Sequence, residues 1–133
     1  MVTPAKKRRA ARLSLGEQVE YVVLDKSEYG QCSTESKDIS SLGICIIGFE
    51  KLKVGDVLGL AFAIPRPALF KPKRKQFLTA RGKVVWINGL RIGNKRTDMA
   101  FEMGIEFIHI NAEDRDRIQK LVSAKILRFA RRR

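Results

Sequence analysis

The 133-residue sequence contains few of the residues on which catalysis, metal binding and disulfide bonding depend. It has two cysteines, Cys32 and Cys45, and one histidine, His109. This set provides no zinc-ligand spacing and no disulfide framework. It also lacks a Gly-rich phosphate loop of Walker or Rossmann spacing, and no nucleophile motif accompanies His109, whose alternation with apolar residues is typical of a structural histidine. We therefore predict that the protein is not an enzyme and needs no metal or cofactor.

Long hydrophobic runs are also missing. The longest uncharged stretch, Ile39 to Phe49, has eleven residues, whereas a membrane-spanning helix needs about 20. The basic N-terminus is followed by only a few apolar residues before Glu17, so no signal-peptide apolar region develops. The hydrophobic fraction of 44% is ordinary for a globular protein. We expect one soluble, cytoplasmic domain.

Acidic residues are scarce relative to basic ones. The sequence has 14 Asp and Glu against 27 Lys and Arg, a net charge of +13. Five cations lie in the first twelve residues, ten lie between Val57 and Thr97, and seven follow Asp116. Such segregated charge attracts anions over long distances. The composition therefore predicts an anionic partner, and the basic stretch at residues 70–75 is either a solvated loop or a surface for an acidic partner.

Hydrophobic alternation and β-branched residues predict six strands, with turn residues between them. One turn is expected at 54–56 and another near Asn88-Gly89. In the last strand we place Phe101, Met103, Ile105, Phe107 and His109 on one face. The expected strands span residues 17–24, 29–38, 43–49, 57–64, 76–86 and 99–110. This pattern indicates an all-β-dominated fold, an antiparallel barrel or sandwich, with one C-terminal helix.

The predicted helix begins after Asn111, a favoured N-cap residue. Acidic residues follow in its first turn and a half, where they complement the positive end of the helix dipole. An apolar stripe then follows the helical repeat and predicts packing across the barrel or over one of its mouths. The stripe consists of Ile118, Leu121, Val122, Lys125, Ile126 and Phe129.

Two short motifs precede the apolar strand at 43–49. The first is Arg8-Arg9-Ala10-Ala11-Arg12, an Arg-x-x-x-Arg spacing, and the second is Asp38-Ile39-Ser40-Ser41-Leu42-Gly43, an Asp-x-Ser-x-x-Gly spacing. Either alone also suits a solvated tail or an ordinary turn. In this order and within six predicted strands, they resemble the PilZ family of cyclic di-GMP receptors.

The resemblance extends along most of the chain. Gly82-Lys83-Val84-Val85-Trp86 is similar to the family's Gly-x-Val-x-Trp strand, and Gly104-Ile105-Glu106-Phe107 is similar to its closing strand. The resemblance implies a six-stranded antiparallel PilZ-type barrel at residues 16–110. It also implies a flexible basic N-terminal arm at residues 1–15 and a C-terminal helix with a basic tail at 111–133.

The ligand's chemistry suits these residues. Arg8 and Arg12 can form forked hydrogen bonds to phosphate or to guanine O6 and N7, and they can stack on a purine. Asp38 can accept from guanine N1–H and the 2-amino group. We expect Ser40 to add a hydroxyl contact and Gly43 to permit close approach of a base or of backbone.

Further cations and one aromatic residue complete the predicted site. Arg9 and Lys7 would hold phosphates or a second ligand molecule, a role that the resemblance implies. Trp86 is an additional candidate, although a core or barrel-rim position suits it better.

The predicted function is a switch. Cyclic di-GMP would bridge arm and barrel, and the changed surface or assembly would report to a downstream protein partner in a bacterial cytoplasm. Two alternatives are a small basic barrel that binds nucleic acid through surface charge and a ligand-free adaptor. The shortage of exposed aromatic residues disfavours the first, and the intact motifs disfavour the second.

Overall fold

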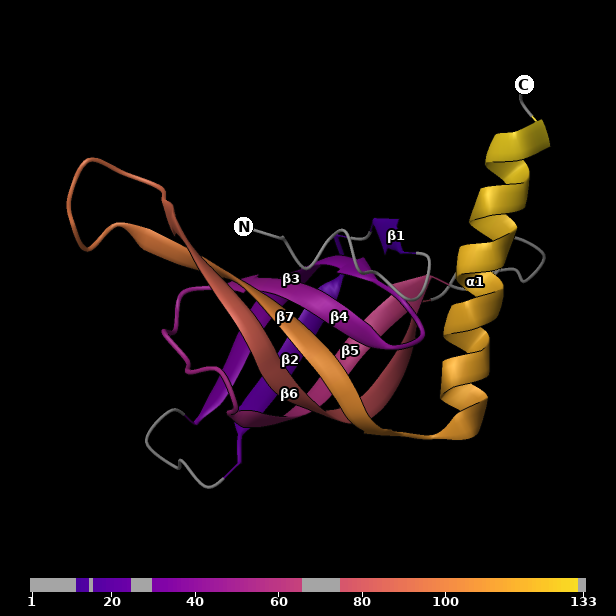
Figure 1. Ribbon diagram of the computed structural model, residues 1–133, viewed down its shortest axis with the longest axis horizontal. Helices are drawn as coiled ribbons and strands as arrows, with labels where there is room; N and C mark the ends of the chain where they lie inside the picture. The colour runs from indigo at the N-terminus through magenta and orange to yellow at the C-terminus, as the bar shows by residue number, and fades with distance from the viewer. Residues whose placement is uncertain (1–11, 15, 25–29, 66–74, 132–133) are drawn as a thin grey trace.

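The computed structural model describes residues 12–14, 16–24, 30–65 and 75–131, with the backbone alone at residues 75 and 125–131. Seven strands and one helix follow one another along the chain (Figure 1). They are β1 (Leu13–Ser14), β2 (Gln18–Val23), β3 (Gln31–Ile39), β4 (Gly43–Gly48), β5 (Val57–Pro65), β6 (Lys75–Arg91), β7 (Met99–Ile110) and α1 (Ala112–Arg131).

The strands form an antiparallel barrel. Their order is β1-β3-β2-β5-β6-β7-β4, and an additional pairing of β3 with β4 closes the sheet on itself. Six strands make the closed barrel, and the two-residue β1 continues the β2 edge by pairing with the end of β3. The predicted fold, a six-stranded antiparallel barrel with one C-terminal helix, is confirmed.

Inward-facing side chains fill the barrel with one apolar core. Strand β2 alternates as predicted, β5 also alternates over its first six residues, and the rings of Phe62 and Phe107 stack with centroids 5.7 Å apart. From α1, Ile118 and Val122 join the same cluster and are essentially fully buried. Asn111 caps the helix, because its Oδ1 accepts the Glu113 N–H at 2.8 Å. The predicted N-cap and the first part of the apolar stripe are therefore confirmed.

The turn between β4 and β5 lies at the predicted place. Gly55 has a φ of +100°, a conformation that suits glycine because it has no Cβ. Asp56 closes the turn: its Oδ2 accepts the Lys53 N–H at 2.8 Å. Local residue chemistry thus determines this connection.

The turn predicted near Asn88-Gly89 is wrong. Strand β6 continues through both residues, which pair with Glu102 and Phe101, and the chain reverses at residues 92–98 instead. The Asp98 side chain stabilises this turn by accepting the Lys95 N–H at 3.1 Å. The hairpin therefore extends well beyond the barrel, at the opposite end of the molecule from α1 (Figure 1).

His109 does not share a face with Phe101, Met103, Ile105 and Phe107 as predicted. Gly82 pairs with Phe107 and Arg81 pairs with His109, so a β-bulge lies between them. The extra residue reverses the alternation. Phe107 is consequently buried, whereas His109 is exposed.

Candidate ligand-binding site

The two N-terminal motifs meet at one ion pair. Strand β1 pairs with the end of β3 so that Ser14 lies opposite Asp38. This pairing places the preceding Arg12 beside Asp38, and Arg12 Nη1 donates to Asp38 Oδ1 at 2.5 Å. The two side chains are 23% and 14% exposed. Residues 26 positions apart thus form one half-buried, charge-assisted contact on the outside of the barrel.

Asp38 belongs to a continuous row of residues across four barrel strands. Asp38 pairs with Cys45, Cys45 with Gly104, and Gly104 with Trp86. Directly paired residues point to the same face of a sheet. We call the row Ser14, Asp38, Cys45, Gly104 and Trp86 the platform. The neighbouring row faces the core and consists of Leu13, Ile39, Ile44, Ile105 and Val84, all buried.

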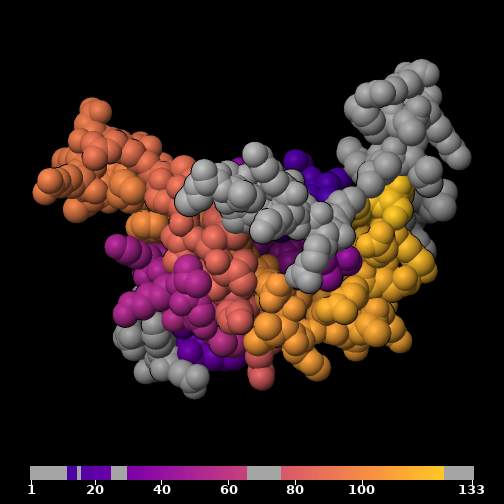
Figure 2. Space-filling view, in the orientation of Figure 1, coloured from indigo at the N-terminus to yellow at the C-terminus, as the bar shows by residue number. Residues whose placement is uncertain are grey.

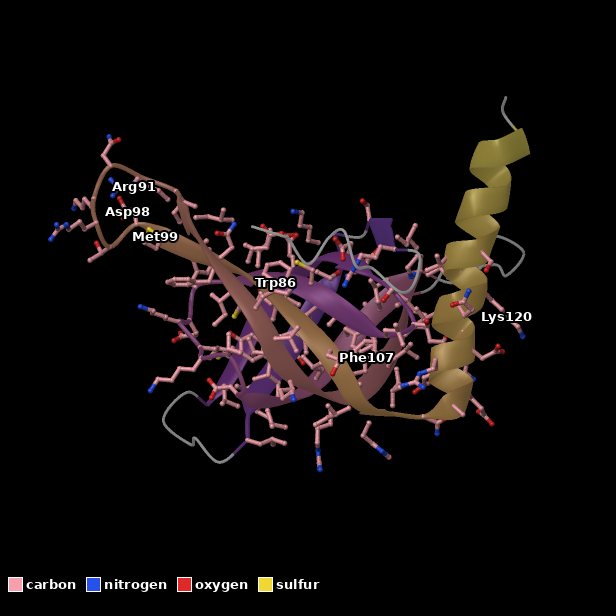
Figure 3. The ribbon with its side chains drawn as sticks, viewed as in Figure 1. Trp86, Arg91, Asp98, Met99, Phe107 and Lys120 are labelled. Atoms are coloured by element: carbon pink, nitrogen blue, oxygen red, sulfur yellow. The ribbon has the colours of Figure 1, made fainter. Side chains whose placement is uncertain are left out.

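The middle of the platform carries small side chains. A Cβ on Gly104 would overlap the Trp86 indole Nε1, so the indole lies directly over this glycine (Figure 3 labels Trp86). A bulge between Val84 and Trp86 turns the indole outward. Strand spacing places Asp38 and Trp86 about 14 Å apart across β3, β4, β7 and β6. The platform therefore offers a carboxylate at one end and an aromatic ring that extends from the other end over Gly104, with the small side chain of Cys45 between them.

A second ion pair lies beside the platform. Lys37, the extra residue of a bulge in β3, donates to Glu102 Oε2 at 2.7 Å. This hydrogen bond and the Glu102 charge raise the pKa of Lys37. Cys45 Sγ donates to the same carboxylate at 3.6 Å. Burial, reinforced by the negative charges of Asp38 and Glu102, raises the pKa of Cys45 to about 12.

Ser40 and Gly43 shape the connection between β3 and β4. The Ser40 side chain is only 2% exposed, and its Oγ accepts the Leu42 N–H at 3.1 Å. A Cβ on Gly43 would overlap the Ile105 carbonyl oxygen, so here the backbone of β7 makes the close approach that glycine permits. These contacts fix the β3–β4 connection that follows Asp38.

The structure brings together some of the predicted site residues and does not describe others. Arg12, Asp38 and Trp86 lie on or beside the platform, whereas Lys7, Arg8 and Arg9 lie outside the described residues. The sequence patterns did not point to Lys37, Cys45, Glu102 and Gly104 as site residues. Gly104 was visible as part of a motif, but only the cross-strand register shows that it lies between Asp38 and Trp86.

A separate hollow of about 570 Å³ lies over the outer faces of β2, β5 and β6. Glu20, Gly59, Thr79, Arg81 and His109 are among its lining residues. None of the predicted site residues that the structure describes lines it. In the described part of the chain, no three His, Cys, Asp or Glu side chains are grouped to hold a metal ion. No helix described here has the length and apolarity needed to cross a membrane.

The described residues thus form a small closed antiparallel barrel with a cation and a carboxylate paired on its outer face. The chain belongs to the PilZ family: the PilZ domain model matches residues 6–124. A search of curated protein sequences finds no match to the chain.

Solved structures share the fold at low sequence identity. The Bacillus subtilis inhibitor of motility (MotI/DgrA) has a TM-score of 0.68 and 18% identity, covering 91% of this chain and 52% of its own. The K. pneumonia MrkH–cyclic di-GMP complex has a TM-score of 0.65 and 16% identity, covering 95% and 55%. The YcgR PilZ domain with cyclic di-GMP, from Escherichia coli, has a TM-score of 0.62 and 12% identity, covering 95% of both chains. The chain thus spans about half the length of the first two.

Proposed function

We propose that this protein is a cyclic di-GMP receptor that binds its ligand on the platform. The observation that carries the proposal is the contact of Arg12 with Asp38, which unites the Arg-x-x-x-Arg and Asp-x-Ser-x-x-Gly motifs at one place. Family membership and the cyclic di-GMP complexes of MrkH and YcgR support it. The protein acts by binding and release rather than by catalysis.

The Arg12–Asp38 pair leaves groups available to a guanine. Asp38 Oδ1 accepts from Arg12, and the described residues supply no partner for Oδ2. That oxygen can accept from guanine N1–H or the 2-amino group. Arg12 donates through Nη1, and its remaining N–H groups can reach guanine O6 and N7 or a phosphate. One ion pair therefore provides both the acceptor and the donors that distinguish guanine from adenine.

The other proposed ligand contacts surround this pair. Arg8, Arg9 and Lys7 supply cations for the two phosphates, which the single Arg12 charge does not neutralise. Trp86 offers its indole to a base at the far end of the platform. Ser40 and Gly43 keep the β3–β4 connection in place, and Gly43 does so through its close packing on β7.

Ligand binding would transmit a signal by drawing the N-terminal segment onto the barrel. The phosphates would neutralise its arginines, and the surface that includes β1 would change. We propose that a downstream protein in the bacterial cytoplasm, acidic where it meets this basic chain, recognises the change.

Calorimetric titration with cyclic di-GMP tests the site. Asp38→Asn and Arg12→Gln should each weaken binding about 10- to 100-fold, because each removes a hydrogen bond to a charged group. Arg8→Gln should have a similar effect. Asp116→Asn and Arg115→Gln on α1 serve as matched controls and should bind normally. Unchanged affinity in both Asp38→Asn and Arg12→Gln would overturn the site.

Ligand selectivity and fluorescence test the roles of the individual groups. Cyclic di-AMP should bind far more weakly, because adenine lacks the N1–H and 2-amino donors that Asp38 accepts. Trp86 is the single tryptophan, so its emission should change on titration with cyclic di-GMP. Equal affinity for both dinucleotides would contradict guanine reading by Asp38.

A further inference from the structure

The end of the β6–β7 hairpin projects from the barrel as an isolated structure. We call residues 89–100 the arm, and from here on the word refers to this hairpin end and not to the basic N-terminal segment 1–15. Strand β5 pairs with β6 only as far as Lys83, and β4 pairs with β7 only from Phe101 onward. The arm therefore consists of the ends of two strands that pair only with each other and are joined by a turn. Figure 2 shows it extending clear of the body of the molecule.

The arm carries three cations without counter-charges. Arg91, Lys95 and Arg96 are exposed, and none forms an ion pair with any residue the structure describes. Asp98 is the arm's single acid, and its carboxylate accepts the Lys95 backbone N–H inside the turn. Figure 3 labels Arg91 and Asp98 at this end of the hairpin. The arm thus presents a net positive tip.

Some cations elsewhere on the described surface have acidic partners. On α1, Arg117 contacts Asp114 at 2.6 Å, and Lys120 contacts Asp116 at 2.9 Å. At the platform, Arg12 pairs with Asp38 and Lys37 with Glu102. These pairs reduce the local field, whereas at the arm the single charge of Asp98 opposes three exposed cations within six residues. Charge alone therefore marks the arm as a surface for an extended anion.

We propose that the arm binds double-stranded DNA, with Arg91, Lys95 and Arg96 on phosphates. The major groove of B-DNA admits a two-stranded β-ribbon. Ile92, 59% exposed at the tip, supplies an apolar group for a thymine methyl in the groove. This activity is separate from cyclic di-GMP binding and does not depend on the platform.

The side chains of the arm favour duplex DNA over other anions. Residues 91–97 contain no aromatic side chain, and single-stranded nucleic acid is usually held by stacking on aromatic rings. The major groove of double-stranded RNA is too narrow for side chains to read. The shortage of aromatic side chains in the sequence therefore argues against a single-stranded nucleic acid as the partner, and it does not argue against duplex DNA.

The proposal is tested by measuring the binding of a 30-base-pair DNA duplex of random sequence. Fluorescence anisotropy gives the binding constant at each concentration of a salt series. The arm variant is Arg91→Gln/Lys95→Gln/Arg96→Gln. Its matched control is Arg115→Gln/Arg117→Gln/Lys120→Gln on α1, which removes the same charge and also lowers +13 to +10. The arm variant should reduce the slope of log K against log salt by about 2.7, since three phosphate contacts are lost. The α1 variant should keep the slope of the unchanged protein.

Each contrary outcome overturns the proposal. The proposal is wrong if the arm variant has the same slope of log K against log salt as the unchanged protein. It is also wrong if both variants reduce this slope equally, which would indicate an effect of net charge alone. Failure to bind the duplex at low salt would likewise overturn the proposal. Tighter binding of single-stranded DNA or double-stranded RNA would identify another nucleic acid. If polyglutamate displaces the labelled duplex as effectively per charge as unlabelled DNA does, the partner is an acidic protein and the proposal is wrong. Circular dichroism and thermal melting check that both variants are folded.

Discussion

The platform and the arm share strands β6 and β7, yet their cations have opposite surroundings. On and beside the platform two described cations meet carboxylates, in the Arg12–Asp38 and Lys37–Glu102 pairs. In the arm, Arg91, Lys95 and Arg96 have no such partner among the described residues. The platform lies over four barrel strands, whereas the arm has neighbours only across one hairpin. The high net charge is therefore distributed over regions in which the cations have different surroundings.

The largest expected difference between the regions is in thiol reactivity. A pKa of about 12 in place of the ordinary 9.0 lowers the thiolate fraction of Cys45 at pH 8 about 1000-fold, and the thiolate is the nucleophile. In a Cys32→Ala background, Cys45 should react with iodoacetamide at least about 1000-fold more slowly than a thiol introduced in the arm by Asn94→Cys. Mass spectrometry measures both rates. Comparable rates in the folded protein would contradict the description of the platform, and equal rates in urea provide the control.

The next largest difference is in the loss of stability when a methyl group is added to a glycine of each region. Gly43→Ala would place a Cβ on the Ile105 carbonyl oxygen, which cannot move without shifting strand β7. We expect a loss of about 3 kcal/mol in the free energy of unfolding. In the arm, Gly89→Ala meets only the flexible methyl end of Met99, at 3.0 Å, and should change stability by less than about 0.5 kcal/mol. Urea unfolding measures both, and similar losses would show that the arm is packed as tightly as the barrel.

A smaller effect is expected from the Arg12–Asp38 pair. A double-mutant cycle with Arg12→Gln and Asp38→Asn should give a coupling energy of about 1 kcal/mol, because the contact is charge-assisted but partly screened by solvent. Arg91→Gln in the arm should change the free energy of unfolding by less than about 0.5 kcal/mol. Denaturant titrations in low and high salt measure both values. Zero coupling at low salt would show that the pair adds nothing to stability.

The smallest effect should come from Lys37. Its pKa is raised in the folded protein by the hydrogen bond and charge of Glu102. The pair therefore stabilises the fold fully below the ordinary lysine value of 10.5, and this stability is lost as the pH rises above it. Because 52% of the side chain is exposed, we expect less than about 0.5 kcal/mol. The stability difference between the unchanged protein and Lys37→Met should shrink as the pH rises above 10.5, and a difference that grows with pH would contradict the assignment.

Local sequence patterns predicted the strands, the Gly55 turn and the N-cap at Asn111, because each depends on residues close together in the chain. The reversal of the β6–β7 hairpin was misplaced for the same reason. Asn-Gly is a strong local hairpin signal, but in this chain Asn88 and Gly89 pair within the extended strand. The side chain of Asp98 and the long pairing with β7 outweigh it. Three bulges, at Ser36/Asp38, Arg81/Gly82 and Val84/Trp86, left no mark in the sequence that we recognised.

The candidate site was predicted in part. The two motifs pointed to Arg12 and Asp38, and the contact between them is present. The neighbours Lys37, Cys45 and Glu102 were missed, because no local pattern connects Lys37 with a carboxylate 65 residues away. Ser40 was expected to touch ligand through its hydroxyl, and the structure shows this hydroxyl buried and bonded to the Leu42 N–H. The ligand contacts of the predicted residues stay predictions until cyclic di-GMP is titrated.

The sequence by itself determined the amount of charge, the strand-forming segments and the two motifs, since these depend on residue type and short spacing. Only the tertiary structure decided which cations are neutralised and which remain free. Ion pairs and hydrogen bonds form over a few ångströms, and strand register together with bulges sets those distances. The same +13 therefore becomes paired charge at the platform and unpaired charge on the arm.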